Sequence, residues 1–164
     1  MFGKDLPKHA SVMVHTRPAA HLEAYRFLER SHLPTLIVSL QHPAANLQAL
    51  LRRQGTSTHN VMFMDTVSKR SDAELLPNAD YLFNPDLSEL GKRMVQQLHN
   101  HPGEKIVVLD AASTLRHWYS QPVVSSFIGA LQSCLRDVNT HLVVLNEESL
   151  PALPNVRFDQ VVQV

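Results

Sequence analysis

The sequence of 164 residues predicts an α/β fold, a three-layer, doubly wound and mainly parallel sheet with helices on both faces. Short apolar runs alternate with helical patterns along the chain. Two of the runs, KIVVLD (105–110) and HLVVLN (141–146), hold four consecutive apolar residues each, which is typical of strands buried on both faces. A chain of this length corresponds to about one domain. We therefore expect residues 1–164 to form a single domain.

The strands are expected where apolar runs are bounded by turn residues. The last run, VRFDQVVQV, alternates between polar and apolar residues and predicts a strand at the edge of the sheet. The expected strands are 11–15, 35–40, 61–65, 81–84, 105–110, 141–146 and 156–164.

The helices are expected where apolar residues recur every three or four positions. The first has Pro18 in its first turn and Thr16 as a plausible N-cap. The second ends at Gly55, which suits a left-handed residue after a helix. The expected helices are 18–30, 43–54, 87–100 and 122–137. The third has three possible N-caps: Asn84, Asp86 and Ser88.

Composition excludes several classes of protein. Lysine and arginine number 15, as do aspartate and glutamate, so nucleic acid is an unlikely partner. No apolar run approaches the roughly 18 residues of a membrane span, and no signal peptide is expected. The single cysteine, Cys134, excludes an internal disulfide and a cysteine-based zinc site. A cytoplasmic protein without a metal is expected.

In such a sheet, ligands bind beyond the carboxyl ends of the strands. A phosphate cradle after the first strand needs glycines and a lysine, and residues 15–20 contain neither. Arg17 could hold an anion weakly there, although a solvated arginine is the more ordinary interpretation. His42 follows the second strand, where a general base could stand, but we expect an ordinary surface histidine.

Asp110 ends the strand 105–110 and has two interpretations. Its carboxylate could hold Mg²⁺ through water, or it could cap the following turn by accepting backbone N–H bonds. Without a phosphate loop, the cap is favoured. Glu147 and Glu148 follow the strand 141–146 and would face the same rim. Farther along from Asp110, the aromatic pair Trp118 and Tyr119 could mark an interface or could pack in the core.

Two long segments resemble the KaiC/RecA superfamily of ATPase domains. KIVVLDAASTLRHWYSQPVVSSFIGALQSCLRDVNTHLVVLNEES is similar to the half in which a strand ends in the Walker B aspartate. LPTLIVSLQHPAANLQALLRRQGTSTHNVMFMDTVS is similar to the stretch in which a helix ends at glycine and the next strand ends in aspartate. The likeness covers residues 11–148. It is closest to small archaeal relatives of KaiC that lack the phosphate loop.

The resemblance implies a RecA-like sheet with the strand order 5-1-4-3-2. By position, Asp110 matches the Walker B aspartate, residues 15–21 occupy the Walker A position, and Gln41 and His42 stand where active members hold catalytic glutamates. Because the phosphate loop, its lysine and these glutamates are absent, the resemblance argues against ATP hydrolysis.

The expected function is therefore that of a non-catalytic RecA-like domain that regulates or assembles with other proteins, including copies of itself. The alternative is a domain that binds a nucleotide or another anion without efficient hydrolysis, through Arg17, Asp110 and Arg116. No catalytic residue and no cofactor are expected, and Mg·ATP is possible but not favoured. A third possibility is an enzyme of another kind that uses His42 or the acidic rim.

Overall fold

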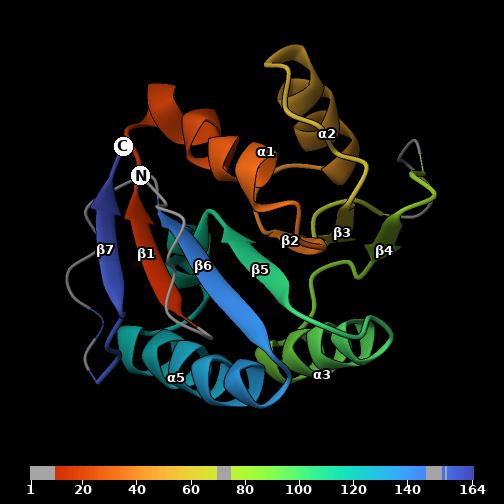
Figure 1. The fold of residues 1–164 in the computed structure, drawn as a ribbon. Helices are drawn as coiled ribbons and strands as arrows, with labels where there is room; N and C mark the ends of the chain where they lie inside the picture. The colour runs from red at the N-terminus through yellow and green to blue at the C-terminus, as the bar shows by residue number, and fades with distance from the viewer. Residues whose placement is uncertain (1–9, 70–74, 147–152, 154) are drawn as a thin grey trace.

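The computed structural model describes residues 10–69, 75–146, 153 and 155–164. Within them, seven strands form one sheet in which every neighbouring pair is parallel (Figure 1). From β1 to β7, the strands are Ser11–His15, Thr35–Ser39, Val61–Asp65, Ala79–Tyr81, Lys105–Asp110, Thr140–Asn146 and Gln160–Gln163.

The strands are ordered β4-β3-β2-β5-β6-β1-β7 across the sheet. If β1, β2, β5, β6 and β7 are counted one to five along the chain, they follow the expected order 5-1-4-3-2. The sheet differs from that expectation in detail, because β3 and β4 extend it beyond β2. The α/β class is confirmed, and β7 is an edge strand, as its alternating sequence predicts.

Helices cover both faces of the sheet. They are η1 and α1 (Pro18–Phe27 and Leu28–Ser31), α2 (Ala44–Arg53), α3 (Leu87–His99), η2 and α4 (Ala112–Thr114 and Leu115–Trp118) and α5 (Gln121–Asp137). Figure 1 shows α3 and α5 on one face and the η1, α1 and α2 layer on the other. In β5, Val107 and Leu109 pack toward α3 and α5, whereas Ile106 and Val108 pack toward the opposite layer. This burial on both faces explains the continuous apolar run.

Two helix ends lie where their residues predict. Of the three candidate caps for α3, the structure uses Asp86, whose Oδ1 accepts a hydrogen bond of 2.7 Å from the Glu89 backbone N–H. After α2, Gly55 takes a left-handed φ of 83°, which glycine adopts without a steric penalty.

The segment after β1 departs from the expected helix over 18–30. It is a 3₁₀ helix followed by the short helix α1. The prediction that Thr16 caps it is wrong, because Arg17 holds the N-cap position and makes no side-chain cap. The Thr16 hydroxyl instead lies 3.2 Å from Nδ1 of His21, within the buried interior.

Two strands, β4 and β7, differ by more than one residue from the bounds that the sequence predicts. β4 covers residues 79–81 rather than 81–84, because the chain turns away after Tyr81 and Asn84 takes a left-handed φ of 48°. β7 covers 160–163 rather than 156–164. Its partly buried neighbours Val156 and Phe158 pack against the core outside the ladder.

Candidate functional site

Polar residues end three neighbouring strands at the carboxyl edge of the sheet. The register aligns Ser39 of β2 with Asp65 of β3 on one side and with Asp110 of β5 on the other. All three residues are 0% exposed. Burying a carboxylate costs free energy unless it is hydrogen-bonded. The hydrogen-bond partners of the two aspartates therefore show how this edge of the sheet is built.

Two side chains from η1 hold the Asp110 carboxylate. His21 Nε2 lies 2.6 Å from Oδ1, and the Tyr25 hydroxyl donates to the same oxygen at 2.7 Å. Since an ionised carboxylate only accepts, the imidazole donates from Nε2. The other oxygen, Oδ2, has no hydrogen-bond partner in the described part of the chain. His21 and Tyr25 thus contact Asp110 from η1, and the aspartate is completely buried.

The hydrogen bonds continue from His21 to two further strands. Its Nδ1 lies 3.2 Å from Thr16 Oγ1, and the Thr16 hydroxyl donates to the Asn146 carbonyl at 3.4 Å. The Thr16 backbone N–H donates to the same carbonyl at 2.8 Å. We call Thr16, His21, Tyr25 and Asp110 the buried polar cluster. It joins η1 to the ends of β1, β5 and β6.

Asp110 does not cap the turn that follows it, so that prediction is wrong. The next residue, Ala111, takes a left-handed φ of 54°, and the turn is closed by the Thr114 backbone N–H, which donates to the Ala111 carbonyl at 2.9 Å. The carboxylate is turned away from this backbone because its hydrogen bonds go to His21 and Tyr25 on η1.

The capping aspartate of this edge is Asp65. Its Oδ2 accepts from the Ala44 backbone N–H at 2.7 Å and from the Ser68 hydroxyl at 2.9 Å. Its Oδ1 accepts from the backbone N–H groups of Val67 and Ser68, at 2.9 and 2.8 Å. Because Pro43 at the N-cap of α2 makes no side-chain cap, Asp65 satisfies that helix terminus from the end of β3.

The side chains of the two arginines predicted to bind an anion take no part in the hydrogen bonds of the buried polar cluster. Arg17 is exposed after β1, and Arg116 is exposed on α4. Within the described residues, neither guanidinium is bonded to Asp110, whose partners are His21 and Tyr25. The structure therefore assembles Asp110 with η1 and not with the predicted arginines.

The predicted aromatic pair has two different environments. Trp118 is 72% exposed at the end of α4, whereas Tyr119 is half-buried and packs against the core beneath α3 and α5. Of the two, Trp118 is therefore the residue available to a partner.

The other candidates at this edge can be placed briefly. His42 is half-buried, and its carbonyl accepts a hydrogen bond from the Ser39 hydroxyl. Glu147 and Glu148 lie outside the described residues. Cys134 is an exposed free thiol on α5. Across the described residues, no three histidine, cysteine, aspartate or glutamate side chains gather as metal ligands, and no helix is long and apolar enough to cross a bilayer.

His21 and Tyr25 were not expected as partners of Asp110. Their spacing of four residues was the available signal, because it places both on one face of a helical segment. A histidine on that apolar face needs a hydrogen-bond partner, and the aspartate at the end of the most apolar strand could supply it. Asp65 had a weaker signal, since only its position at a strand end, before Ser68, marked it.

Comparison with known proteins identifies the fold. No family model matches the sequence, and no curated protein matches it. An uncharacterised protein of Pyrococcus horikoshii, crystallised with an unknown peptide, has a similar structure, with a TM-score of 0.64 and 12% identity. The match covers 87% of this chain and 71% of that protein.

A KaiC-like protein of the same archaeon is also similar, with a TM-score of 0.58 and 10% identity. The match covers 85% of this chain, which spans 62% of that protein. Together with the parallel sheet, these similarities show that the domain has a KaiC-like, RecA-like α/β fold. At this identity, they show the fold alone.

Proposed function

We propose that this domain is a non-catalytic RecA-like module that acts in the cytoplasm by binding other proteins, in regulation or assembly. The observation that carries the proposal is the enclosure of Asp110. This residue stands at the strand end where KaiC-like ATPases hold the Walker B aspartate, and it is 0% exposed beneath His21 and Tyr25.

The residues of this edge do not fit Mg·ATP. Phosphoryl transfer depends on a loop of backbone N–H groups around the phosphates, a lysine, and a carboxylate that reaches the metal. Residues 15–34 contain neither glycine nor lysine. The carboxylate that would face the metal already accepts two hydrogen bonds from the protein. Binding a nucleotide there would require the buried polar cluster to come apart.

Features on the surface support a role in protein binding. Trp118 presents a large exposed ring, of the kind enriched at interfaces. An apolar groove of about 720 Å³ lies between α3 and α5, with Val123 and Phe127 among its lining residues. One of the similar solved structures was crystallised with an unknown peptide, which makes a peptide-binding role for this fold a reasonable extension to this chain.

The proposal is tested first by calorimetric titration with Mg·ATP and Mg·ADP at low salt, together with an ATP hydrolysis assay. We expect no heat of binding and no hydrolysis by protein whose thermal unfolding shows that it is folded. Binding with a micromolar Kd, or turnover, would contradict the non-catalytic proposal.

The binding role is tested separately by pull-down from the host cell and by sedimentation at high protein concentration. Trp118→Ala should weaken the association detected, while Leu50→Ala, at an exposed apolar residue of α2 outside the groove, serves as the control. Monomeric behaviour together with the capture of no partner would contradict a role in assembly.

A second candidate is a domain that binds a nucleotide or another anion without efficient hydrolysis. It is favoured by the exposure of Arg17 and Arg116, neither of which pairs with a carboxylate in the described part of the chain. If calorimetry detects anion binding, Arg17→Ala and Asp110→Ala should each weaken it. Unchanged affinity in both variants would remove this site.

A further inference from the structure

Among the described residues, no strand lies beyond β7 at this edge of the sheet. β7 pairs with β1 on one side, and four of the five residues 160–164 are exposed. The Val164 backbone donates to the His15 carbonyl and accepts from the Arg17 N–H, so its polar groups face β1. Because alternate residues of a strand direct these groups to opposite sides, the N–H and C=O of Val161 and Gln163 point away from β1. Since no described residue bonds to them, they are a template for pairing with another strand.

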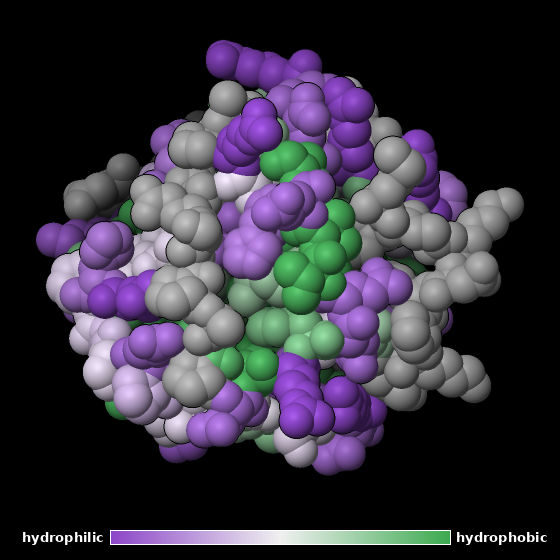
Figure 2. Space-filling view, turned by 90° about the vertical axis from the view of Figure 1, so that its left-hand side faces the viewer, coloured by the Kyte–Doolittle hydropathy of each residue, from purple (hydrophilic) through white to green (hydrophobic). Residues whose placement is uncertain are grey.

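Apolar side chains accompany these free backbone groups. Val161 is 63% exposed, and Val164 is 37% exposed. Figure 2 views the molecule from the β7 side and shows hydrophobic residues gathered in the middle of this face, with hydrophilic residues around them. In monomeric proteins, charged residues or proline usually protect an edge strand from pairing with another chain. Residues 160–164 include neither.

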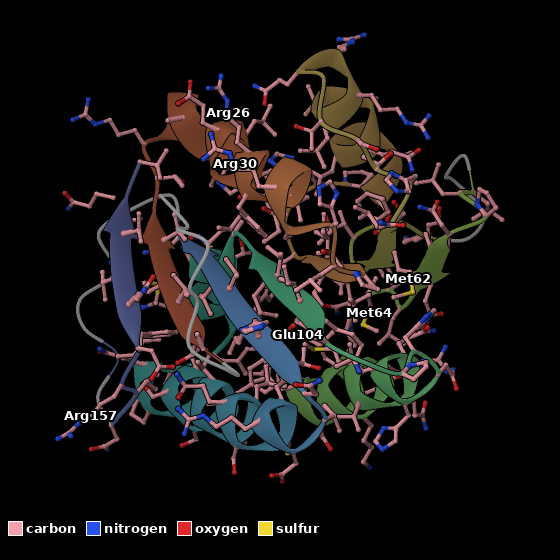
Figure 3. All side chains as sticks on the ribbon, in the orientation of Figure 1. Arg26, Arg30, Met62, Met64, Glu104 and Arg157 are labelled. Carbon is pink, nitrogen blue, oxygen red and sulfur yellow. The ribbon has the colours of Figure 1, made fainter. Side chains whose placement is uncertain are left out.

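A basic pocket of about 350 Å³ lies at the carboxyl end of β7. Arg26 and Arg30 line it together with Phe27, and Glu23 is its acidic residue. Both arginines are exposed, and neither forms an ion pair within the described residues. Figure 3 shows them close together on the segment formed by η1 and α1. The remaining lining residues are Ala24, Gln163 and Val164.

The opposite edge of the sheet is protected. β4 pairs with β3 over three residues only. Its Asp80 accepts a hydrogen bond of 2.9 Å from Arg93 of α3, and its Oδ2 accepts one of 3.4 Å from Gln97. A short strand with a charged side chain tied to a helix is a poor template for pairing. The two edges therefore differ, and β7 is the edge at which another strand can pair.

We propose that the β7 edge binds an extended, acidic segment of a partner protein, which adds to the sheet as a further strand. The segment presents an acidic side chain to Arg26 and Arg30 and an aliphatic side chain to Val161. Main-chain hydrogen bonds to Val161 and Gln163 supply affinity, and the two side-chain contacts supply selectivity. This inference rests on the proposed protein-binding function and names the surface and the kind of partner.

Charge favours an acidic segment over a second copy of this chain. β7 itself carries no charged residue, and the carboxylate that precedes it in the sequence, Asp159, is already engaged. It accepts from the Ser11 backbone N–H at 2.7 Å and from the Ser11 hydroxyl at 2.9 Å. A second β7 would bring valines to the edge but no free carboxylate for Arg26 and Arg30.

The test uses a fluorescein-labelled peptide of alternating valine and glutamate, and an otherwise identical peptide of valine and lysine. We expect the glutamate peptide to raise the fluorescence anisotropy and to bind at least about tenfold more tightly than the lysine peptide. In hydrogen exchange, the backbone amides of Val161 and Gln163 should gain protection when the glutamate peptide binds.

Two pairs of variants locate the site. Val161→Pro removes an N–H that points away from β1, so the fold should persist and peptide binding should be lost, whereas Val161→Thr keeps the N–H and should keep binding. The double variant Arg26→Glu, Arg30→Glu should weaken binding at least about tenfold. The control is Arg53→Glu, a charge reversal on the exposed end of α2, which should leave peptide binding unchanged.

Several outcomes would overturn the inference. These are no binding of the glutamate peptide, equal binding by Val161→Pro, and self-association that Val161→Pro abolishes while the peptide fails to bind. The last outcome assigns the edge to a second copy. None of these outcomes changes the result expected from the nucleotide titration. If wild type and Val161→Pro capture a partner equally well, the proposed protein-binding function stands, but the partner does not bind at the β7 edge.

Discussion

Asp110 and Asp65 both end a strand of the same sheet and are both completely buried, yet their carboxylates serve different parts of the chain. Asp65 accepts from nearby backbone N–H groups and from the first turn of α2. Asp110 accepts from His21 and Tyr25 of η1. At the scale of the residue, the same side chain in equivalent positions is therefore a helix cap in one case and the anchor of a buried cluster in the other.

The variant Asp110→Asn tests the buried polar cluster. It replaces the charged acceptor of two hydrogen bonds by an amide, and such bonds to charged groups are worth about 1.5–3 kcal/mol each when they cannot be replaced. We expect a loss of about 2 kcal/mol and a fall in Tm of about 4–8 °C. Chemical and thermal denaturation measure both quantities.

The exposed residue Asp137, at the end of α5, provides the control, and Asp137→Asn should change the stability by less than about 0.5 kcal/mol. A double-variant cycle with Tyr25→Phe should show coupling between positions 25 and 110. An unchanged Tm in Asp110→Asn would mean that the cluster contributes nothing to stability.

The lowered pKa of Asp159 predicts how the stability of the protein depends on pH. Hydrogen bonding from the Ser11 backbone N–H lowers the pKa of Asp159 in the folded protein, and the Ser11 hydroxyl and Arg136 act in the same direction. A carboxyl group whose pKa is lowered by folding stabilises the protein above its unfolded pKa, near about 3.9, and this stabilisation is lost as pH falls through the folded pKa.

Wild type should therefore be more stable than Asp159→Asn at neutral pH, and the difference should shrink below about pH 4. The difference should be small, because the side chain is 37% exposed and is screened by salt. Thermal melts of both proteins across the acid range measure it. A difference that stays constant through that range would contradict the ionic origin.

At the scale of the element, local signals account for most helices and strands. Asp86 begins α3 and Gly55 follows α2, because capping and left-handed turns depend on residues within a few positions. For the 3₁₀ segment η1, the local pattern predicted the wrong type of helix. Its apolar spacing predicts an α-helix, but His21 and Tyr25 are both held by one carboxylate oxygen of a distant strand.

Two glycines provide a matched prediction at this scale. Gly55→Ala forces an alanine into a left-handed conformation and should cost about 1 kcal/mol, although the added methyl would meet no atom within 4 Å. Gly129→Ala lies within α5 and also meets nothing within 4 Å, so it should stabilise the protein by up to about 1 kcal/mol. Urea denaturation of the two variants should move the midpoint in opposite directions. A shift in the same direction would show that backbone preference does not govern these sites.

At the scale of the whole molecule, the sheet has a buried centre and two unlike edges. β2, β5 and β6 are buried along their whole length, whereas β4 is half-buried and β7 is mostly exposed. Local opening is easiest where few apolar contacts and many exposed hydrogen bonds meet. The stability of the domain should therefore fall from the centre of the sheet to its edges.

Native-state hydrogen exchange tests this gradient. Amides of β2, β5 and β6 should exchange most slowly, with protection close to the global free energy of unfolding, and those of β4 and β7 fastest. If the β7 amides that bond to β1 were as protected as those of β5, the edge would not be available to the partner strand proposed above.

The sequence alone determined the α/β class, the buried character of the central strands and the ends of α2 and α3, because periodicity, glycine and helix caps act over a few residues. It also showed that the segment after β1 lacks the glycines and the lysine of a phosphate loop. The partners of Asp110 could not be read from local sequence, since His21 and Tyr25 lie 89 and 85 positions away along the chain. The same holds for the exposed valines Val161 and Val164, which share one edge with Arg26 and Arg30, because strand order and helix placement follow from long-range packing that no local pattern encodes.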